Sequence, residues 1–200
     1  MTETLSSANE ADSLVVEPPE LFIKTLTLYH GSGAPGVESF NVAVEDTVGK
    51  GVYLVDNRED AAGYARRRAR GKEDTQPVVY EAKVENLKLV NLDNQSKLDE
   101  IMRGFAIELR HIKVSSPEAP WYVPATIDRR LEEIQNGIRA GQVKKAVFSH
   151  TGLFTDYLQG LGYDGLKAFE GGEGEDVGEH ETYLIFNPRK VKITAEIPLS

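Results

Sequence analysis

The sequence predicts an α+β domain, and three observations lead to that prediction. Segments typical of β-strands lie near both ends of the chain, between residues 21 and 92 and again between residues 165 and 197. Segments whose apolar residues recur at helical spacing are inserted between these strands. No internal repeat is visible, and the length of 200 residues fits one domain with a tail.

Composition narrows the classes of function. The hydrophobic fraction of 40% is enough for a core, and the net charge of -9 argues against binding polyanions through overall charge. The absence of cysteine excludes disulfides, thiolate catalysis and Cys-ligated metal, and it fits the cytoplasm of a producing or a target cell. No apolar run approaches 18 residues and no basic segment follows Met1, so neither a membrane span nor a secretory signal is predicted.

The N-terminal part of the chain divides into a tail and a first strand. Residues 1–20 hold five acidic residues and no basic residue, which predicts a disordered acidic tail before a domain of residues 21–200. Leu21 to Tyr29 alternates and is expected to be the first strand. His30-Gly31-Ser32-Gly33 follows it directly, and a loop continues to Thr47.

The stretch from Gly49 to Asp56 reads as a short apolar strand entered through two glycines. Asp56 or Asn57 can cap the helix that follows, with acidic residues in its favourable first turn. This helix carries several alanines and Tyr64, and it ends in a cluster of basic residues: Arg66, Arg67, Arg68, Arg70 and Lys72.

The remaining elements follow from periodicity and from glycine and proline positions. Strands are predicted over residues 77–84, 87–92, 165–169, 182–186 and 191–197. Helices are predicted from Ser96 to about residue 112, from Ile127 to near Gly141, and over residues 153–161. Loops are predicted over residues 115–124 and over the acidic, glycine-rich residues 171–178.

Three separate signals carry candidate chemistry. His30 stands at a strand end before glycines, whose backbone amides are open to a ligand. Tyr53 and Tyr64 lie eleven residues apart at the two ends of a strand-to-helix turn, where they can line an aromatic slot. Glu181 precedes a buried strand directly after a glycine-rich loop. Each signal alone is also explained by packing or solvation.

In this order, the three signals resemble the ADP-ribosyltransferases of the His-Tyr-Glu class, which covers diphtheria-toxin-like and poly(ADP-ribose) polymerase-like enzymes. The match is close over residues 49–65. The segments of residues 161–165 and 183–188 look like the small bacterial and phage-borne members. The resemblance extends over about residues 26–195 and is patchy over residues 93–150.

The resemblance implies a split β-sandwich that binds NAD, the co-substrate, in a central cleft. By this resemblance His30 would hydrogen-bond a ribose hydroxyl, and Gly31 would bind the nicotinamide carboxamide through its backbone with help from Ser32. Tyr53 and Tyr64 would hold the nicotinamide-ribose end, with Tyr64 stacked on the ring, because an aromatic face suits a flat cation. A carboxylate would stabilise the charge that develops on the ribose.

The position of this carboxylate departs from the family pattern. Many members have the catalytic Glu immediately before the Tyr of this strand. In this chain that Tyr is Tyr183, the residue before it is Thr182, and Glu181 stands one residue earlier. Side chains alternate along a strand, so Glu181 would need a bulge to face the cleft. We take Glu181, with His30 and Tyr53, as the catalytic set. Thr182 with no acid and Glu179 remain the alternatives, and chain elongation is expected on none of them.

The sequence leaves the acceptor open. Glu173, Glu175 and Asp176 favour a cationic target, whereas the basic cluster after Tyr64 reads either as a solvated helix end or as a contact for NAD phosphates or nucleic acid. His111, His150 and His180 are too scattered to form a metal-ligand pattern, so no metal site is predicted.

The predicted function is therefore a mono-ADP-ribosyltransferase with a protein or nucleic-acid acceptor, acting as a toxin, an effector or a phage-conflict protein. An antitoxin or immunity partner stays open. One alternative is a non-catalytic NAD-binding module. Another is a tRNA 2′-phosphotransferase, which would need arginines around His30, where the sequence shows none.

Overall fold

The computed structural model describes residues 20–41, 50–72, 75–115, 122–141, 151–170 and 177–199, without the side chains of residues 122–125 and 151. The predicted acidic tail therefore lies outside the described residues, apart from Glu20. So do Gly49 and His150, as well as most of the acidic loop, including Glu173, Glu175 and Asp176.

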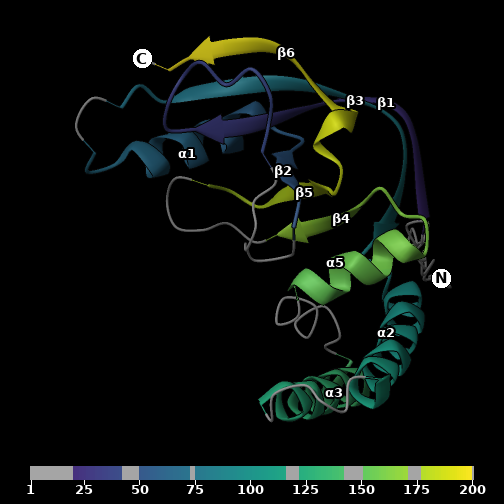
Figure 1. The fold of residues 1–200 in the computed structure, drawn as a ribbon. Helices are drawn as coiled ribbons and strands as arrows, with labels where there is room; N and C mark the ends of the chain where they lie inside the picture. The colour runs from purple at the N-terminus through teal and green to yellow at the C-terminus, as the bar shows by residue number, and fades with distance from the viewer. Residues whose placement is uncertain are drawn as a thin grey trace, which may run out of the picture.

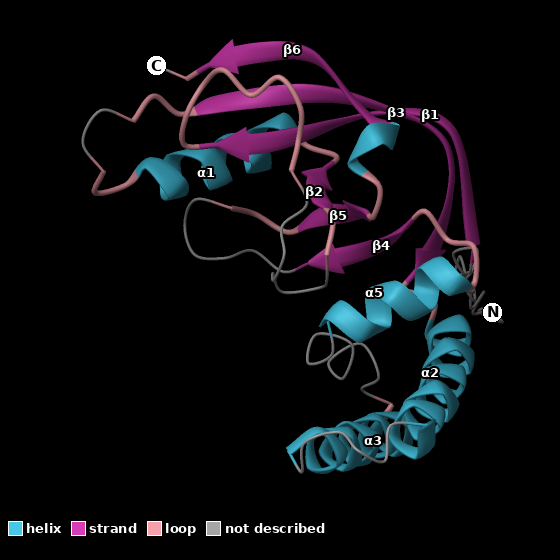
Figure 2. Cartoon of the chain, in the orientation of Figure 1, coloured by secondary structure: helices cyan, strands magenta, loops and turns pink. Residues whose placement is uncertain are grey.

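The predicted α+β class is confirmed (Figures 1 and 2). The described elements in chain order are β1 (Glu20–Ser32), β2 (Val52–Val55), α1 (Arg58–Ala69), β3 (Val78–Asn91), α2 (Gln95–Ser115), α3 (Tyr122–Ala140), α5 (Thr151–Gly160), β4 (Gly165–Glu170), β5 (His180–Ile185), the 3₁₀ helix η1 (Pro188–Lys190) and β6 (Val191–Pro198). Helices thus lie between strands along the chain. No described helix is both long and apolar enough to cross a membrane.

The described strands belong to one hydrogen-bonded sheet, in the order β1-β2-β5-β4-β3-β6, and the additional pairing of β1 with β3 folds this sheet into two layers. The long antiparallel pair of β1 and β3 carries β6 on the far side of β3, and β2, β5 and β4 form the second layer (Figure 1). The layers join where Tyr29 of β1 pairs with Val55 of β2, and where β4 runs parallel to the last residues of β3. The end of β1 and the start of α1 are thereby brought beside β2 and β5.

Side-chain alternation along β5 divides the core in two. Tyr183 and Ile185 face the space between the two layers, with Leu28 and Tyr80 from the other layer. Leu184 and Phe186 face the opposite way, into the cluster that α2, α3 and α5 build against the second layer. In Figure 1 these helices cover the side of β4 away from β6, whereas α1 lies under β1 and β3.

The differences from the predicted elements are local. Residues 78–91 form one strand rather than two, because β1 pairs with this segment on both sides of Asn86, whose φ is 51°. Strand β1 runs on to Ser32 instead of stopping at Tyr29. Of the two predicted caps, Asn57 is the one used, and its side chain accepts a hydrogen bond from the backbone of Glu59. Helix α3 begins at Tyr122, inside the predicted loop.

Candidate active site

A cavity of about 370 Å³ lies where β1, β2, β5 and α1 meet. This volume is at the lower end of the roughly 300–1,000 Å³ typical of small-molecule sites. Five residues singled out from the sequence line it: His30, Gly31, Tyr53, Tyr64 and Thr182. They come from four different elements, and Thr182 is 118 positions along the chain from Tyr64, so only the fold brings them together.

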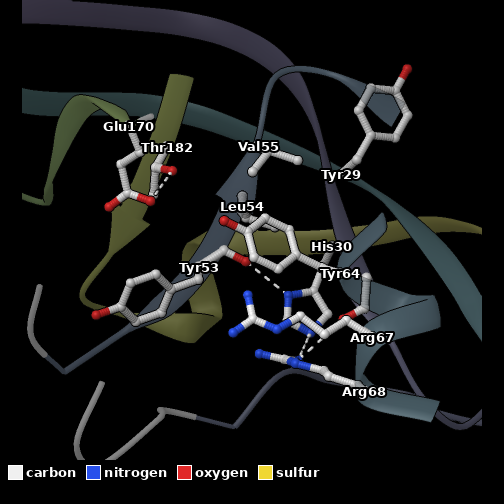
Figure 3. Close-up of a pocket in the computed structure, with 11 residues that line it drawn as sticks. Tyr29, His30, Tyr53, Leu54, Val55, Tyr64, Arg67, Arg68, Glu170 and Thr182 are labelled. Atoms are coloured by element: carbon white, nitrogen blue, oxygen red, sulfur yellow. Dashed lines mark hydrogen bonds between the residues drawn. The ribbon is translucent and has the colours of Figure 1, made fainter. Parts of the chain in front are cut away.

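His30 is held in one orientation and one tautomer. Its Nδ1 donates a hydrogen bond to the carbonyl of Tyr53 at 2.8 Å, so in the neutral ring Nε2 is the acceptor. Arg68 Nη1 lies 3.3 Å from that Nε2 and also donates to the carbonyl of Gly31 at 3.1 Å (Figure 3). Burial lowers the pKa of His30, the bond to the Tyr53 carbonyl partly opposes this, and the Arg68 charge lowers the pKa further. The imidazole is therefore neutral at pH 7.

This lowered pKa of His30 predicts a pH-dependent stability. Between its ordinary pKa near 6.5 and the lower folded value, the unfolded chain binds the proton and the folded chain does not. The contribution of His30 to the free energy of unfolding is thus complete above about pH 6.5 and is lost as the pH falls through the folded pKa. Urea unfolding at pH 7.5 and pH 5.0 should show a smaller loss on acidification in His30→Gln than in the wild type. An equal loss in both proteins would contradict this assignment.

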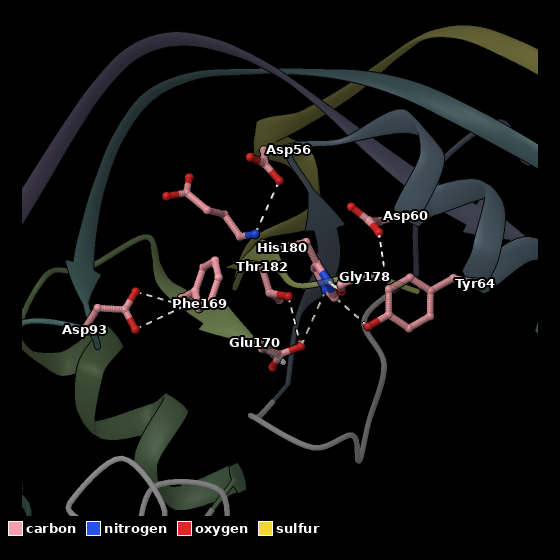
Figure 4. Close-up of polar contacts among 10 residues, drawn as sticks. Asp56, Asp60, Tyr64, Asp93, Phe169, Glu170, Gly178, His180 and Thr182 are labelled. Carbon is pink, nitrogen blue, oxygen red and sulfur yellow. Dashed lines mark hydrogen bonds and ion pairs between the residues drawn. The ribbon is translucent and has the colours of Figure 1, made fainter. Parts of the chain in front are cut away.

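Tyr64 is linked to the start of β5 through His180. Its hydroxyl lies 3.2 Å from His180 Nε2, and the two rings meet edge to face with centroids 5.6 Å apart. His180 Nδ1 donates to the carbonyl of Gly178 at 2.8 Å, and the backbone of Gly178 donates to the buried carboxylate of Asp60 at 3.0 Å (Figure 4). These contacts fix the orientation of the Tyr64 ring. The sequence had marked His180 only as a scattered histidine.

Two arginines of the basic cluster also line the cavity, which corrects the expectation that no arginine lies near His30. Arg67 and Arg68 follow Tyr64 by three and four residues, and these spacings place side chains on one face of a helix. This helical spacing was the signal that could have placed them beside Tyr64. In the view of Figure 3 they lie on one side of the Tyr64 ring, with Glu170 and Thr182 on the other. The cavity therefore has a cationic wall.

Glu181, the predicted catalytic acid, does not line the cavity. Its carboxylate takes an ion pair from Lys167 and a hydrogen bond from the Tyr183 hydroxyl at 2.7 Å. The pairing of β5 with β2 and with β4 runs without a break over the described residues, so the bulge that would have turned Glu181 inward does not occur. By strand alternation, Thr182 faces the cavity instead.

Glu170 provides a carboxylate that the sequence did not indicate. It is the last residue of β4, it lines the cavity, and it accepts a hydrogen bond from Thr182 Oγ1 at 2.9 Å. In the sequence it stands 12 positions before Thr182 with a glycine-rich loop between them, and nothing local marks it. Only the antiparallel pairing of β4 with β5 brings the two side chains together.

Two further predicted residues lie elsewhere. The hydroxyl of Ser32 bonds within its own turn, to the carbonyl of Ala34 at 2.8 Å, and Ser32 is not among the residues that line the cavity. Glu179 is exposed before β5 and does not line it either. Over the part of the chain that the structure describes, no group of three or more His, Asp or Glu side chains is placed to hold a metal ion.

Comparison with known proteins adds one similarity. No protein-family model matches the chain, and no curated protein matches it in sequence. Among solved structures, a chain of the crystal structure of the M. tuberculosis MbcT–MbcA toxin–antitoxin complex is 10% identical. The match covers 91% of this chain and 88% of that chain, with a TM-score of 0.44. At these values the similarity carries no argument about function, which rests on the cavity itself.

Proposed function

We propose that this protein is a mono-ADP-ribosyltransferase of the split β-sandwich type, which cleaves NAD at the nicotinamide-ribose bond and transfers ADP-ribose to a macromolecule. The observation that supports this most directly is the convergence of His30, Gly31, Tyr53, Tyr64 and Thr182 on one cavity. These are five of the seven residues that the family resemblance selects. They come from β1, β2, α1 and β5, which are separate segments of the sequence.

The chemistry of the cavity wall fits the nicotinamide half of NAD. The face of Tyr64 can stack on the flat, cationic nicotinamide ring. Arg67 and Arg68 can neutralise the pyrophosphate, which binds best to guanidinium groups. Neutral His30 has its Nδ1 proton committed to Tyr53, so Nε2 can accept a hydrogen bond from a sugar hydroxyl in exchange for Arg68.

The direct test is incubation of the purified protein with NAD and measurement of free nicotinamide. Labelled NAD with a cell lysate, followed by protease or nuclease digestion, then shows whether protein or nucleic acid carries the label. Nicotinamide release with transfer of label supports the proposal. Binding of NAD without release identifies a non-catalytic NAD-binding module instead.

Tyr64→Ala is expected to weaken NAD binding roughly 10-fold, because a desolvated aromatic contact with a cation contributes about 1 to 2 kcal/mol. Tyr64→Phe keeps the ring and loses only the hydroxyl that meets His180, so it serves as the matched control and should bind NAD almost as the wild type does. Calorimetric titration with NAD measures both. Unchanged affinity in Tyr64→Ala would rule out stacking on this ring.

One observation favours a second candidate function. Arg67 and Arg68 lie beside His30, as a tRNA 2′-phosphotransferase acting on a phosphorylated RNA end would require. Incubation with NAD and a 2′-phosphorylated RNA oligonucleotide distinguishes the two functions. NAD-dependent loss of that phosphate would support the phosphotransferase, and nicotinamide release that does not need this RNA would support the first proposal.

A further inference from the structure

The proposed reaction needs a carboxylate at the sugar, and the fold presents one from an unexpected strand. Glu170 ends β4, where Ala168 pairs with Thr182 and Glu170 pairs with His180 across the antiparallel ladder. The side chain of Glu170 is 22% exposed, so it is sheltered but reachable. Leu166 and Ala168, at alternate positions on the same strand, are buried in the helical core cluster. Glu170 therefore stands where the apolar core gives way to the cavity.

The surroundings of Glu170 orient its carboxylate. Thr182 Oγ1 donates to Oε2 at 2.9 Å, and His180 Nε2 lies 3.9 Å from the same oxygen (Figure 4). His180 is in turn held by Tyr64 and by the carbonyl of Gly178. Both neighbours of Glu170 have almost no freedom, since Thr182 is 2% and His180 3% exposed. The carboxylate is thus oriented by the hydrogen bond from Thr182, with the buried His180 ring packed beside it.

Charge in the cavity is divided between its walls. Arg67 and Arg68 provide cations from α1, and Glu170 is the one carboxylate among the described residues that line the cavity. Thr182, which stands where the family pattern has an acid, cannot carry a negative charge. Its hydroxyl donates a hydrogen bond to Glu170. Where the family pattern has an acid on the strand that corresponds to β5, this chain therefore has a threonine on β5 and an acid on β4.

We propose that Glu170 is the catalytic carboxylate of this site, with Thr182 as its positioning residue. This inference rests on the proposed function. As the bond between the ribose carbon and the nicotinamide nitrogen breaks, its electron pair leaves with nicotinamide, and the Glu170 carboxylate stabilises the positive charge on the sugar. A lone pair of the acceptor then forms the new bond to that carbon, and the proton that the acceptor loses passes to Glu170 and on to solvent.

The test compares Glu170→Gln with the wild type in three measurements: the rate constant for nicotinamide release, the Kd for NAD, and the melting temperature. We expect the rate constant to fall roughly 100-fold or more, as when a preorganised electrostatic group is removed. The Kd should change less than about threefold and the melting temperature should stay close to that of the wild type, because glutamine can still accept the Thr182 bond. Glu170→Asp keeps the charge on a shorter side chain and should retain intermediate activity.

Matched variants separate position from charge. Thr182→Ser keeps the hydroxyl and should restore most of the activity that Thr182→Val loses, which a purely structural role of this residue would not produce. Glu85→Gln removes an exposed carboxylate on β3 and should leave the rate unchanged.

Two negative results have different meanings. If the wild type neither binds NAD nor releases nicotinamide, the proposed function fails and the role of Glu170 fails with it. If the wild type cleaves NAD and Glu170→Gln cleaves it equally fast, the proposed function stands and the assignment of Glu170 is wrong.

Discussion

Replacing Glu181 by glutamine is expected to lower the free energy of unfolding by about 2 kcal/mol and the melting temperature by roughly 4 to 8 °C. The reason is the ion pair with Lys167, whose side chain is only 8% exposed. Removing the charge of one partner from a buried pair leaves the other ion desolvated, which costs about 3 to 5 kcal/mol in a fully buried pair. Glu181 is 30% exposed, so solvent reduces this cost.

The same variant separates stability from chemistry. The rate of nicotinamide release by folded Glu181→Gln should equal that of the wild type, because Glu181 faces away from the cavity. Glu85→Gln breaks an ion pair of the same kind with exposed partners and should not change the melting temperature measurably. Adding Lys167→Met to Glu181→Gln should recover much of the lost stability. Lost turnover with an unchanged melting temperature would instead return the catalytic role to Glu181.

Replacing Gly31 by alanine is expected to destabilise the fold by about 3 kcal/mol or more, a fall of roughly 6 to 12 °C in melting temperature, and to abolish NAD binding. A Cβ at this position would lie 2.0 Å from the carbonyl oxygen of Ala61 and 2.7 Å from the backbone nitrogen of Ala65. Both atoms belong to the backbone of α1 and cannot rotate away, so the helix would have to move off β1. Tyr64 and Arg68 would move with it and leave the cavity.

Gly160 supplies the control for this prediction. It ends α5, and its φ is not in the left-handed region. Among the described residues outside its own helical turn, no atom lies within 4 Å of where its Cβ would stand. Gly160→Ala should therefore match the wild type in melting temperature and in NAD affinity. Thermal unfolding and calorimetric titration of both variants check the pair of expectations. Wild-type behaviour of Gly31→Ala would mean that β1 and α1 do not approach as closely as the structure has them.

The local sequence pattern was sufficient to predict most of the helices and strands. Apolar periodicity, together with glycine, proline and capping residues, predicted each described α-helix and strand at least in part. Strand β3 was expected as two strands, however, and the 3₁₀ helix η1 was not expected. Boundaries were less well predicted where pairing with another strand decides them. Strand β3 continues through Asn86, despite its positive φ, because β1 pairs with residues on both sides of it, and the segment alone does not reveal that pairing.

The site shows a similar division. His30, Gly31, Tyr53 and Tyr64 belong to segments with their own sequence signals, and the strand order brings them into one cavity. Glu170 belongs to a strand whose sequence suggests only packing, and its role depends on the partner across the ladder. Glu170 is a candidate site residue only because β5 places Thr182 beside it.

Considered alone, the sequence specified the α+β class, the order of the elements and the two-tyrosine turn, because these depend on periodicity and on neighbouring residues. The tertiary structure decided which carboxylate faces the cavity. Side chains of adjacent residues point to opposite faces of a strand. With an uninterrupted register, Glu181 therefore pairs with Lys167 on one face of β5, whereas Thr182 faces the cavity on the other and contacts Glu170. Pairing register is a property of two strands together, and neither segment encodes it by itself.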